Sequence, residues 1–429
     1  MTRTRWIALA WILLASGISI WWGSSVWKGT NGWIDFRAVY YGTRCLLHHH
    51  NPYKVSEFPT GGTECPLEPG YAIDRLPVYI NMPTTCIFIA PLAMMPWGPA
   101  RLLWTILTAG VIILAAFLMW NLGARYSAKV SLLLICLLLA NCEVLFGGGN
   151  TAGIVIGLCV VAVWCFLEER FVLVGVLCLA ASLAIKPHDT GLVWLYFLLA
   201  GGVYRKRALQ TLLVTVVLGL SACLWVSHIE PHWIQDWEHN LAIESAPGGI
   251  NEIGRAPWAG HDAAMVICLQ SAVSVFRYDP RFYNLVSYLV CGALLLVWSV
   301  RTLRLRFTQR GALLALAAVV PLTMLVTYHR AWDAKLLMLT VPACALLWAE
   351  GGRIARMALL VTTAGLLLTA DIPLAILSNP SSQLHLGTTG LSAQILTVVL
   401  MRPTPLILLA MSIFYLWIYM RRDPERVCP

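Results

Sequence analysis

Four groups of ionisable side chains interrupt a chain that is otherwise strongly apolar. Asp35 stands in the first group, shortly after the first apolar run, and Lys186–Asp189 form the second between two apolar runs. Tyr328–Asp333 form the third, and the segment 229–282, rich in Trp, His and acidic residues, is the fourth. A charge beside hydrocarbon is costly and usually faces a cavity or a partner. These groups are therefore the candidates for chemistry.

One carboxylate with cations nearby suits the transfer of a sugar that is already linked to phosphate. Glycosidases need two carboxylates, one of them to protonate a poor leaving group. A phosphate leaving group needs no such acid. The reaction needs a base for the acceptor hydroxyl, and positive charge or hydrogen-bond donors for the departing phosphate. We predict Asp35 as the base, and as donor-phosphate ligands Lys186, His188, His329 and Arg330.

Other roles stay open for the carboxylates of these groups. Asp35 could cap a helix beginning at Phe36, because Asp satisfies the unpaired amides at a helix start and suits the helix dipole. Asp189 and Asp333 could be alternative bases or counter-charges for the neighbouring cations Lys186 and Arg330. The pairing role is favoured, since a charge near hydrocarbon needs a counter-charge.

The sequence predicts no metal site and no cofactor. In the run His48–His50, consecutive imidazoles do not share one helix face, which favours a solvated turn over a metal site. The 13 cysteines contain no CxxC pair. Cys45 and Cys65 share one polar segment, where a disulfide and two free thiols are both open. Gly147–Asn150 lacks the Lys-Ser/Thr of a phosphate-binding loop.

Composition indicates an integral membrane protein. The 429 residues are 59% hydrophobic and only 12% charged, whereas soluble domains carry about 25% charged residues. The net charge of +9 does not indicate a nucleic-acid partner, because the basic residues lie in short clusters between apolar runs. We expect an all-α polytopic membrane protein, with residues 1–429 forming one domain in the lipid bilayer.

The apolar runs predict about twelve membrane spans, each near the length that a bilayer requires. They lie near residues 6–26, 99–120, 129–146, 151–167, 171–185, 189–203, 208–228, 283–300, 311–328, 334–349, 357–376 and 403–420. The segments 27–98 and 229–282 are then long loops. Within the first, helical spacing of apolar residues predicts an amphipathic helix from Phe36 to Leu47, and Pro83–Pro96 is a short interfacial or re-entrant helix.

Charge distribution predicts which side each loop faces. Arg3 and Arg5 place the N-terminus in the cytoplasm, and alternating spans then put most of the 30 basic residues into cytoplasmic connections, as the positive-inside rule requires. Both termini are cytoplasmic in this topology. The four ionisable groups all face the extracytoplasmic side. We expect the bacterial inner (plasma) membrane as the location.

Four short motifs follow one another along the chain: Asp35-x4-Tyr40-Tyr41, Asn51-Pro52-Tyr53, Ile185-Lys186-Pro187 and Tyr328-His329. In these motifs and their order, from about residue 30 to 350, the chain resembles glycosyltransferase family 87, a membrane family of the GT-C type. The resemblance implies a polyprenyl-phosphate sugar donor, with mannose as the sugar. It also implies inverting transfer to a hydroxyl of a lipid- or glycan-linked acceptor on the extracytoplasmic face, with Asp35 as general base. Substrate contacts are expected from Tyr40, Tyr41, Tyr53 and Asn150.

Two departures from the family pattern concern the sugar and the acceptor. The family often has Gly-Gln-x-Asn where this chain has Gly147–Asn150, so a polar side chain is missing at Gly148. It often has Tyr-Pro-Pro where this chain has Asn81–Pro83.

Two other classes of protein compete with the interpretation as an enzyme. A secondary transporter or flippase of a lipid-linked or anionic substrate would place its charges near the midplane and often show repeats. A catalytically inactive, lipid-binding relative is the other.

Overall fold

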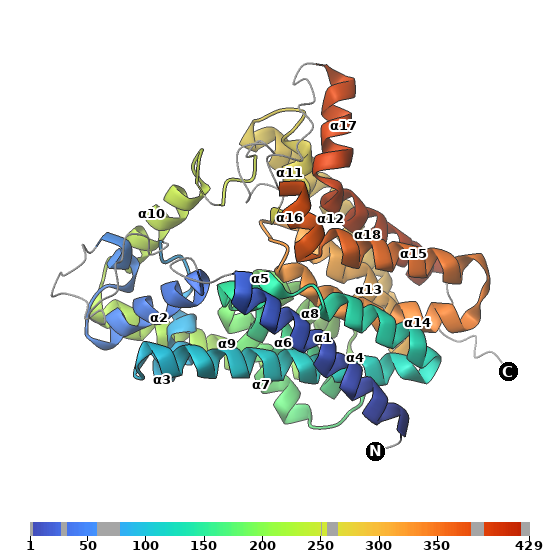
Figure 1. Ribbon diagram of the computed structural model, residues 1–429, viewed down its shortest axis with the longest axis horizontal. Helices are drawn as coiled ribbons and strands as arrows, with labels where there is room; N and C mark the ends of the chain where they lie inside the picture. The colour runs from blue at the N-terminus through green and yellow to red at the C-terminus, as the bar shows by residue number, and fades with distance from the viewer. Residues whose placement is uncertain are drawn as a thin grey trace.

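The chain is helical throughout the part that the structure describes. The computed structural model describes residues 3–26, 32–57, 78–249, 251–254, 265–378 and 390–421. Within these ranges the one β-type pairing is an isolated antiparallel bridge between Val266 and Arg330. The expected all-α class is therefore confirmed (Figure 1).

Among the described residues up to Ser245 there are ten α-helices and one short 3-10 helix. They are α1 (Arg3–Val26), α2 (Ile34–Leu47), η1 (Pro52–Glu57), α3 (Pro83–Ala93), α4 (Trp97–Leu139), α5 (Glu143–Gly148), α6 (Ala152–Leu167), α7 (Val172–Ile185), α8 (Pro187–Leu199), α9 (Gly202–Ile229) and α10 (Trp233–Ser245). α1 packs along α4, and α6 to α9 pack on one another in succession. α2, α3 and α10 lie at one end of the molecule, on the left of Figure 1.

The second half packs against the first through α14 and the 3-10 helix η3. Its elements are α11 (Leu269–Val273), α12 (Pro280–Arg304), α13 (Gln309–Val326), η3 (Asp333–Thr340), α14 (Val341–Glu350), α15 (Gly352–Leu368), α16 (Asp371–Ser378), α17 (Leu391–Met401) and α18 (Pro403–Arg421). α14 lies against α4, α13 pairs with α18, and η3 contacts α6. α17 projects at the top of Figure 1.

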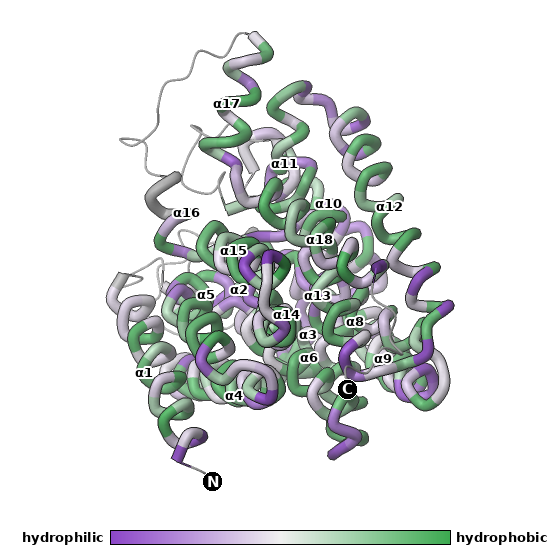
Figure 2. The backbone as a smooth tube through the Cα atoms, turned by 90° about the vertical axis from the view of Figure 1, so that its right-hand side faces the viewer, coloured by the Kyte–Doolittle hydropathy of each residue, from purple (hydrophilic) through white to green (hydrophobic). Residues whose placement is uncertain are grey.

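Six helices in the described part are long and apolar enough to cross a bilayer: α1, α4, α9, α12, α13 and α18. On α9, Leu213, Leu220 and Leu224 are 60–71% exposed, as expected of side chains that face lipid rather than a protein core. Figure 2 shows hydrophobic colour along most of the helices. The chain is an integral membrane protein. The expected count of about twelve spans stays a prediction.

Several expected spans have different boundaries in the structure. The runs 99–120 and 129–146 are divided as expected, at the kink of α4 where Ser127 is non-helical (φ −151°, ψ 99°), but the helix of the second run ends at Leu139. The run 334–349 begins as 3-10 helix and becomes α-helical only from Val341. The run 357–376 is divided between α15 and α16, and α17 was not predicted.

The expected cytoplasmic connections meet one another. Arg125 pairs with Glu168, whose carboxylate also accepts a 3.1 Å hydrogen bond from the Gln309 side chain. Arg310 pairs with Glu350 on the next connection. The connections expected on the other side of the membrane contact each other instead, as described below. In the structure the connections of each set thus contact others of the same set. Which compartment each set faces stays a prediction.

An aromatic cluster fixes the start of α2. The Phe36 ring stacks on Trp104, with ring centroids 4.8 Å apart, and on Trp97 at 5.5 Å. The Tyr40 hydroxyl donates a 2.6 Å hydrogen bond to the Met95 carbonyl at the end of α3. Stacked aromatic pairs add to the free energy of burial. The first turn of α2 is therefore held firmly against α3 and α4.

Candidate active site

Asp35 is the second residue of α2. The helix begins at Ile34, so the alternative in which Asp35 caps a helix beginning at Phe36 is wrong. The N-cap is Trp33, in the left-handed conformation (φ 63°), and the structure shows no side-chain cap hydrogen bond at this helix start. The Asp35 carboxylate instead accepts a 2.8 Å hydrogen bond from the Asn150 side-chain amide.

The junction of α5 and α6 holds Asp35 in place. The Trp33 amide donates to the Gly147 carbonyl at 2.8 Å, and the Trp104 indole donates to the Gly149 carbonyl at 2.9 Å. Gly149 has φ 66°, and a Cβ there would lie 2.9 Å from the Cβ of Phe36. A side chain at this position would be strained both by its backbone conformation and by this contact. Glycine is therefore required where α2 meets this junction.

Gly148 lies directly beside the candidate base. A Cβ built on it would be 3.4 Å from Oδ2 of Asp35, an ordinary van der Waals distance. A longer side chain at this position would therefore begin next to the carboxylate. Since this chain has Gly148 where the family pattern often has Gln, no polar side chain stands at this position beside Asp35. This leaves room on that side of the carboxylate.

Lys186 occupies the break between α7 and α8. Its backbone is non-helical (φ −140°, ψ 83°), because Pro187 begins α8 and disfavours helical geometry in the residue before it. The ammonium lies 2.6 Å from Asp333 and 3.2 Å from Asp189. Burial opposes the charge, but the two carboxylates outweigh it and raise the pKa of Lys186. Lys186 is therefore a buried cation between two anions.

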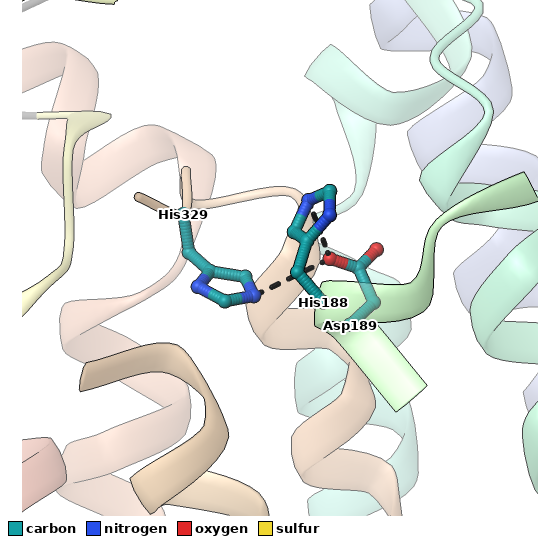
Figure 3. A group of neighbouring side chains, drawn as sticks. All are labelled: His188, Asp189 and His329. Atoms are coloured by element: carbon teal, nitrogen blue, oxygen red, sulfur yellow. Dashed lines mark ion pairs between the residues drawn. The ribbon is translucent and has the colours of Figure 1, made fainter. Parts of the chain in front are cut away.

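His188, Asp189 and His329 form a compact group, drawn in Figure 3. Nε2 of His188 lies 3.3 Å, and Nε2 of His329 3.4 Å, from the same oxygen, Oδ1 of Asp189. Burial and the Lys186 charge lower the pKa of His188 to about 4, although Asp189 opposes this shift. Burial lowers the pKa of His329 too, but the Asp189 carboxylate outweighs it and the net shift is upward.

The Arg330 side chain is held by Tyr328, in its own segment, and by Asn251, in the loop that follows α10. Its Nε donates to the Tyr328 hydroxyl, and its Nη2 lies 3.5 Å from the Asn251 side-chain oxygen. Its backbone amide donates to Asp333 at 2.9 Å. The bridge to Val266 fixes the same segment from outside. Tyr328, a close neighbour in sequence, and Asn251, 79 positions away, thus hold the guanidinium.

Glu244 is a residue that sequence reasoning missed. It lies in the last turn of α10 and is only 8% exposed. Burial raises the pKa of Glu244 above its usual range; the Arg330 charge opposes this shift and the Asp35 charge adds to it. Glu244 is therefore close enough to both groups to interact with their charges. In the sequence, Glu244 is indicated only by the acidic character of segment 229–282.

Eight side chains form what we call the polar cluster: Asp35, Lys186, His188, Asp189, Glu244, His329, Arg330 and Asp333. Burial raises the pKa of Asp35; the Asn150 hydrogen bond and the charges of Arg330 and Lys186 partly offset this. Asp35 keeps part of its surface exposed, as a base requires. The structure thus brings together all four groups that the sequence singled out.

Three expected substrate contacts lie in the packing of the fold instead. Tyr40, Tyr41 and Tyr53 are at most 2% exposed. The Tyr53 hydroxyl donates to the Asn81 carbonyl at 3.1 Å, and the Tyr53 ring stacks on Trp233. In this arrangement the three phenols hold α2 and η1 in place. Their contact with substrate stays a prediction.

Comparison with known proteins supplies one family. Residues 79–246 match the family model of glycosyltransferase family 87. The match confirms the resemblance over less than half of the chain; Asn150, Lys186 and Glu244 lie inside it, and Asp35 and His329 outside. No curated protein and no solved structure matches the chain.

Proposed function

We propose that the chain is a membrane glycosyltransferase of family 87, whose family model matches residues 79–246, and that it transfers a hexose, mannose, from a polyprenyl-phosphate donor. The acceptor is a hydroxyl of a lipid- or glycan-linked molecule on the extracytoplasmic face. The position of Asp35 carries this proposal. Asp35 is a partly exposed carboxylate held by a hydrogen bond from Asn150, and it lies close enough to Lys186 and Arg330 for their charges to lower its pKa.

Asp35 acts as general base in this reaction. It takes the proton of the acceptor hydroxyl as the oxygen attacks the anomeric carbon of the donor sugar. The bond between that carbon and the phosphate oxygen breaks, and its electron pair leaves with the lipid phosphate. The new bond forms on the opposite face, which inverts the configuration. A carboxylate whose pKa is raised by burial is a stronger base than one in water. Proton transfer to a positioned base is most efficient when the pKa of that base lies near the working pH.

The departing phosphate needs positive charge beside Asp35. Lys186 and Arg330 supply it, and the imidazoles of His188 and His329 lie next to Lys186 through Asp189. Asp189 and Asp333 are the counter-charges that hold the Lys186 ammonium in its position. The direct assay incubates membranes containing the chain with a panel of polyprenyl-phosphate sugars and an acceptor glycolipid extract. No transfer from any of them would contradict the proposal and favour an inactive relative or a transporter.

The role of Asn150 gives a prediction on pH dependence. Its hydrogen bond lowers the pKa of Asp35, so Asn150→Ala raises that pKa further. A base works only when deprotonated, and the rate is lost as pH falls through its pKa. The acid limb of kcat/KM therefore shifts to higher pH in this variant. The control is Asn141→Ala, which removes a hydrogen bond to the Leu137 carbonyl away from the site. An unchanged limb in Asn150→Ala would separate Asn150 from the ionisation that controls the rate.

Cysteine labelling tests the proposed sidedness. A membrane-impermeant maleimide added to intact cells should label cysteines introduced at Gly62 and Pro247, and should leave those at Lys206 and Arg306 unlabelled until the membrane is opened. Disulfides form in oxidising compartments, and Cys45 is disulfide-bonded, which supports an extracytoplasmic α2. Cys65 lies outside the described residues, so its pairing stays a prediction. Labelling of Lys206→Cys and Pro247→Cys from the same side would exclude this topology.

A further inference from the structure

We propose that His188, Asp189 and His329 bind a divalent transition-metal cation such as Zn²⁺ or Mn²⁺, which neutralises the donor phosphate. This proposal rests on the proposed function for its role, although the site itself rests on geometry. The sequence led to the opposite expectation, because His188 and His329 come from helix junctions far apart in the chain. The structure brings the donor atoms of the three residues within 4.8 Å of one another.

The two nitrogen–oxygen distances in this group are compatible with shared coordination of one ion. The two imidazole nitrogens lie 3.3 and 3.4 Å from one carboxylate oxygen, beyond the ~2.7–3.2 Å of an N–H···O hydrogen bond. Zinc ligands at ~2.0–2.1 Å in tetrahedral geometry are separated from each other by ~3.3–3.4 Å. Figure 3 shows both nitrogens directed at the same oxygen. Two imidazoles and one carboxylate with an open position form a common catalytic metal site.

The surroundings of His329 support a ligand role. Its Nδ1 lies 3.0 Å from the Thr327 carbonyl, which can only accept, so Nδ1 carries the hydrogen. In the neutral ring this leaves the lone pair on Nε2, which faces Asp189. Metal-binding imidazoles are held in this way by a hydrogen bond from the other nitrogen. His329 is fully buried, and its Nε2 lies 3.4 Å from Oδ1 of Asp189.

The charges of the polar cluster give the cation a function. Lys186 is held between the carboxylates of Asp189 and Asp333, so its positive charge is already balanced. An anionic phosphate would bring further negative charge beside these two carboxylates. A dication on Oδ1 of Asp189 offsets it. Lys186 contacts the other oxygen of that carboxylate, Oδ2, at 3.2 Å, which leaves Oδ1 to the ion.

Metal binding by the full-length, detergent-purified chain tests the site directly. All forms carry Gln at His48–His50 and no histidine tag, so that this run does not contribute. Titration calorimetry with Zn²⁺ and Mn²⁺ should give one ion per chain, and Co²⁺ should give visible absorption of a low-symmetry site. His188→Ala, at a side chain 38% exposed, should fold and weaken binding by about 10- to 100-fold or more. His239→Ala, an exposed histidine on α10, is the matched control and should bind as the parent does.

Failure of the metal site and failure of the proposed reaction give different results. Absence of stoichiometric binding, or equal affinity in His188→Ala and His239→Ala, overturns the metal proposal, whatever the transfer assay shows. Binding that depends on His188 supports it even if Asp35 proves not to be the base. Loss of transfer on chelation, restored by Zn²⁺ or Mn²⁺ in the control and not in His188→Ala, would connect the ion to the reaction.

Discussion

Replacement of Asp35 by Asn reduces sugar transfer about 10²- to 10⁴-fold, the usual contribution of a general base. Asn has the shape of Asp and cannot accept the proton. Because Asp35 makes no capping hydrogen bond in α2, its charge can be removed without loss of a cap. The amount of folded protein should change little. The measurement is transfer from polyprenyl-phosphate mannose by equal amounts of folded protein in matched membranes.

Asp279→Asn is the control for this substitution. Asp279 caps α12 by accepting a 3.0 Å hydrogen bond from the Arg281 amide. Asn is an equally good cap, so this variant should transfer sugar at the parent rate. If Asp35→Asn and Asp279→Asn behave alike, the base is another carboxylate, and Glu244, Asp189 and Asp333 are next to be tested.

Lys186→Met lowers stability as well as activity. The ammonium lies between Asp189 and Asp333, and its side chain is only 13% exposed. Removing one partner of a buried ion pair leaves uncompensated charge and typically costs about 3–5 kcal/mol. We expect a clear fall in the thermal unfolding midpoint in detergent, together with loss of transfer.

Lys54→Met provides the comparison for Lys186→Met. Lys54 pairs with Asp236 at 3.5 Å, and its side chain is 43% exposed; such surface pairs contribute about 0–1 kcal/mol. The two variants remove the same group from different surroundings. A double variant, Lys186→Met with Asp333→Asn, should recover part of the lost stability because one unpaired carboxylate is gone. Equal midpoints for Lys54→Met and Lys186→Met would show that Lys186 is not paired as the structure has it.

The sequence predicted most helices but not where several of them end. Long apolar runs identified α1, α9, α12, α13 and α18, because a bilayer requires such runs whatever the fold. The division at the kink of α4 was predicted, since Ser127 lies in the connection expected between the runs 99–120 and 129–146. The change from 3-10 to α-helix at Val341 is invisible in the sequence, because both conformations bury the same residues.

The candidate site was predicted residue by residue rather than as an arrangement. Asp35, Lys186 and His329 stood out because charge beside hydrocarbon needs a reason. Their partners could not be predicted, since Asn150 reaches Asp35 across 115 positions. Glu244 was missed because its segment contains many polar residues, and only the fold shows which of them is buried beside Arg330.

The two counter-charges of Lys186 are made at very different times during synthesis of the chain. Asp189 is three residues away and emerges from the ribosome with Lys186, whereas Asp333 follows 147 residues later. A nascent chain that has reached α13 therefore carries Lys186 neutralised by its neighbour and suited to insertion beside lipid. The second carboxylate, His329 and Arg330 arrive together with η3. The polar cluster is thus completed late in translation, after α6 to α9 have been made.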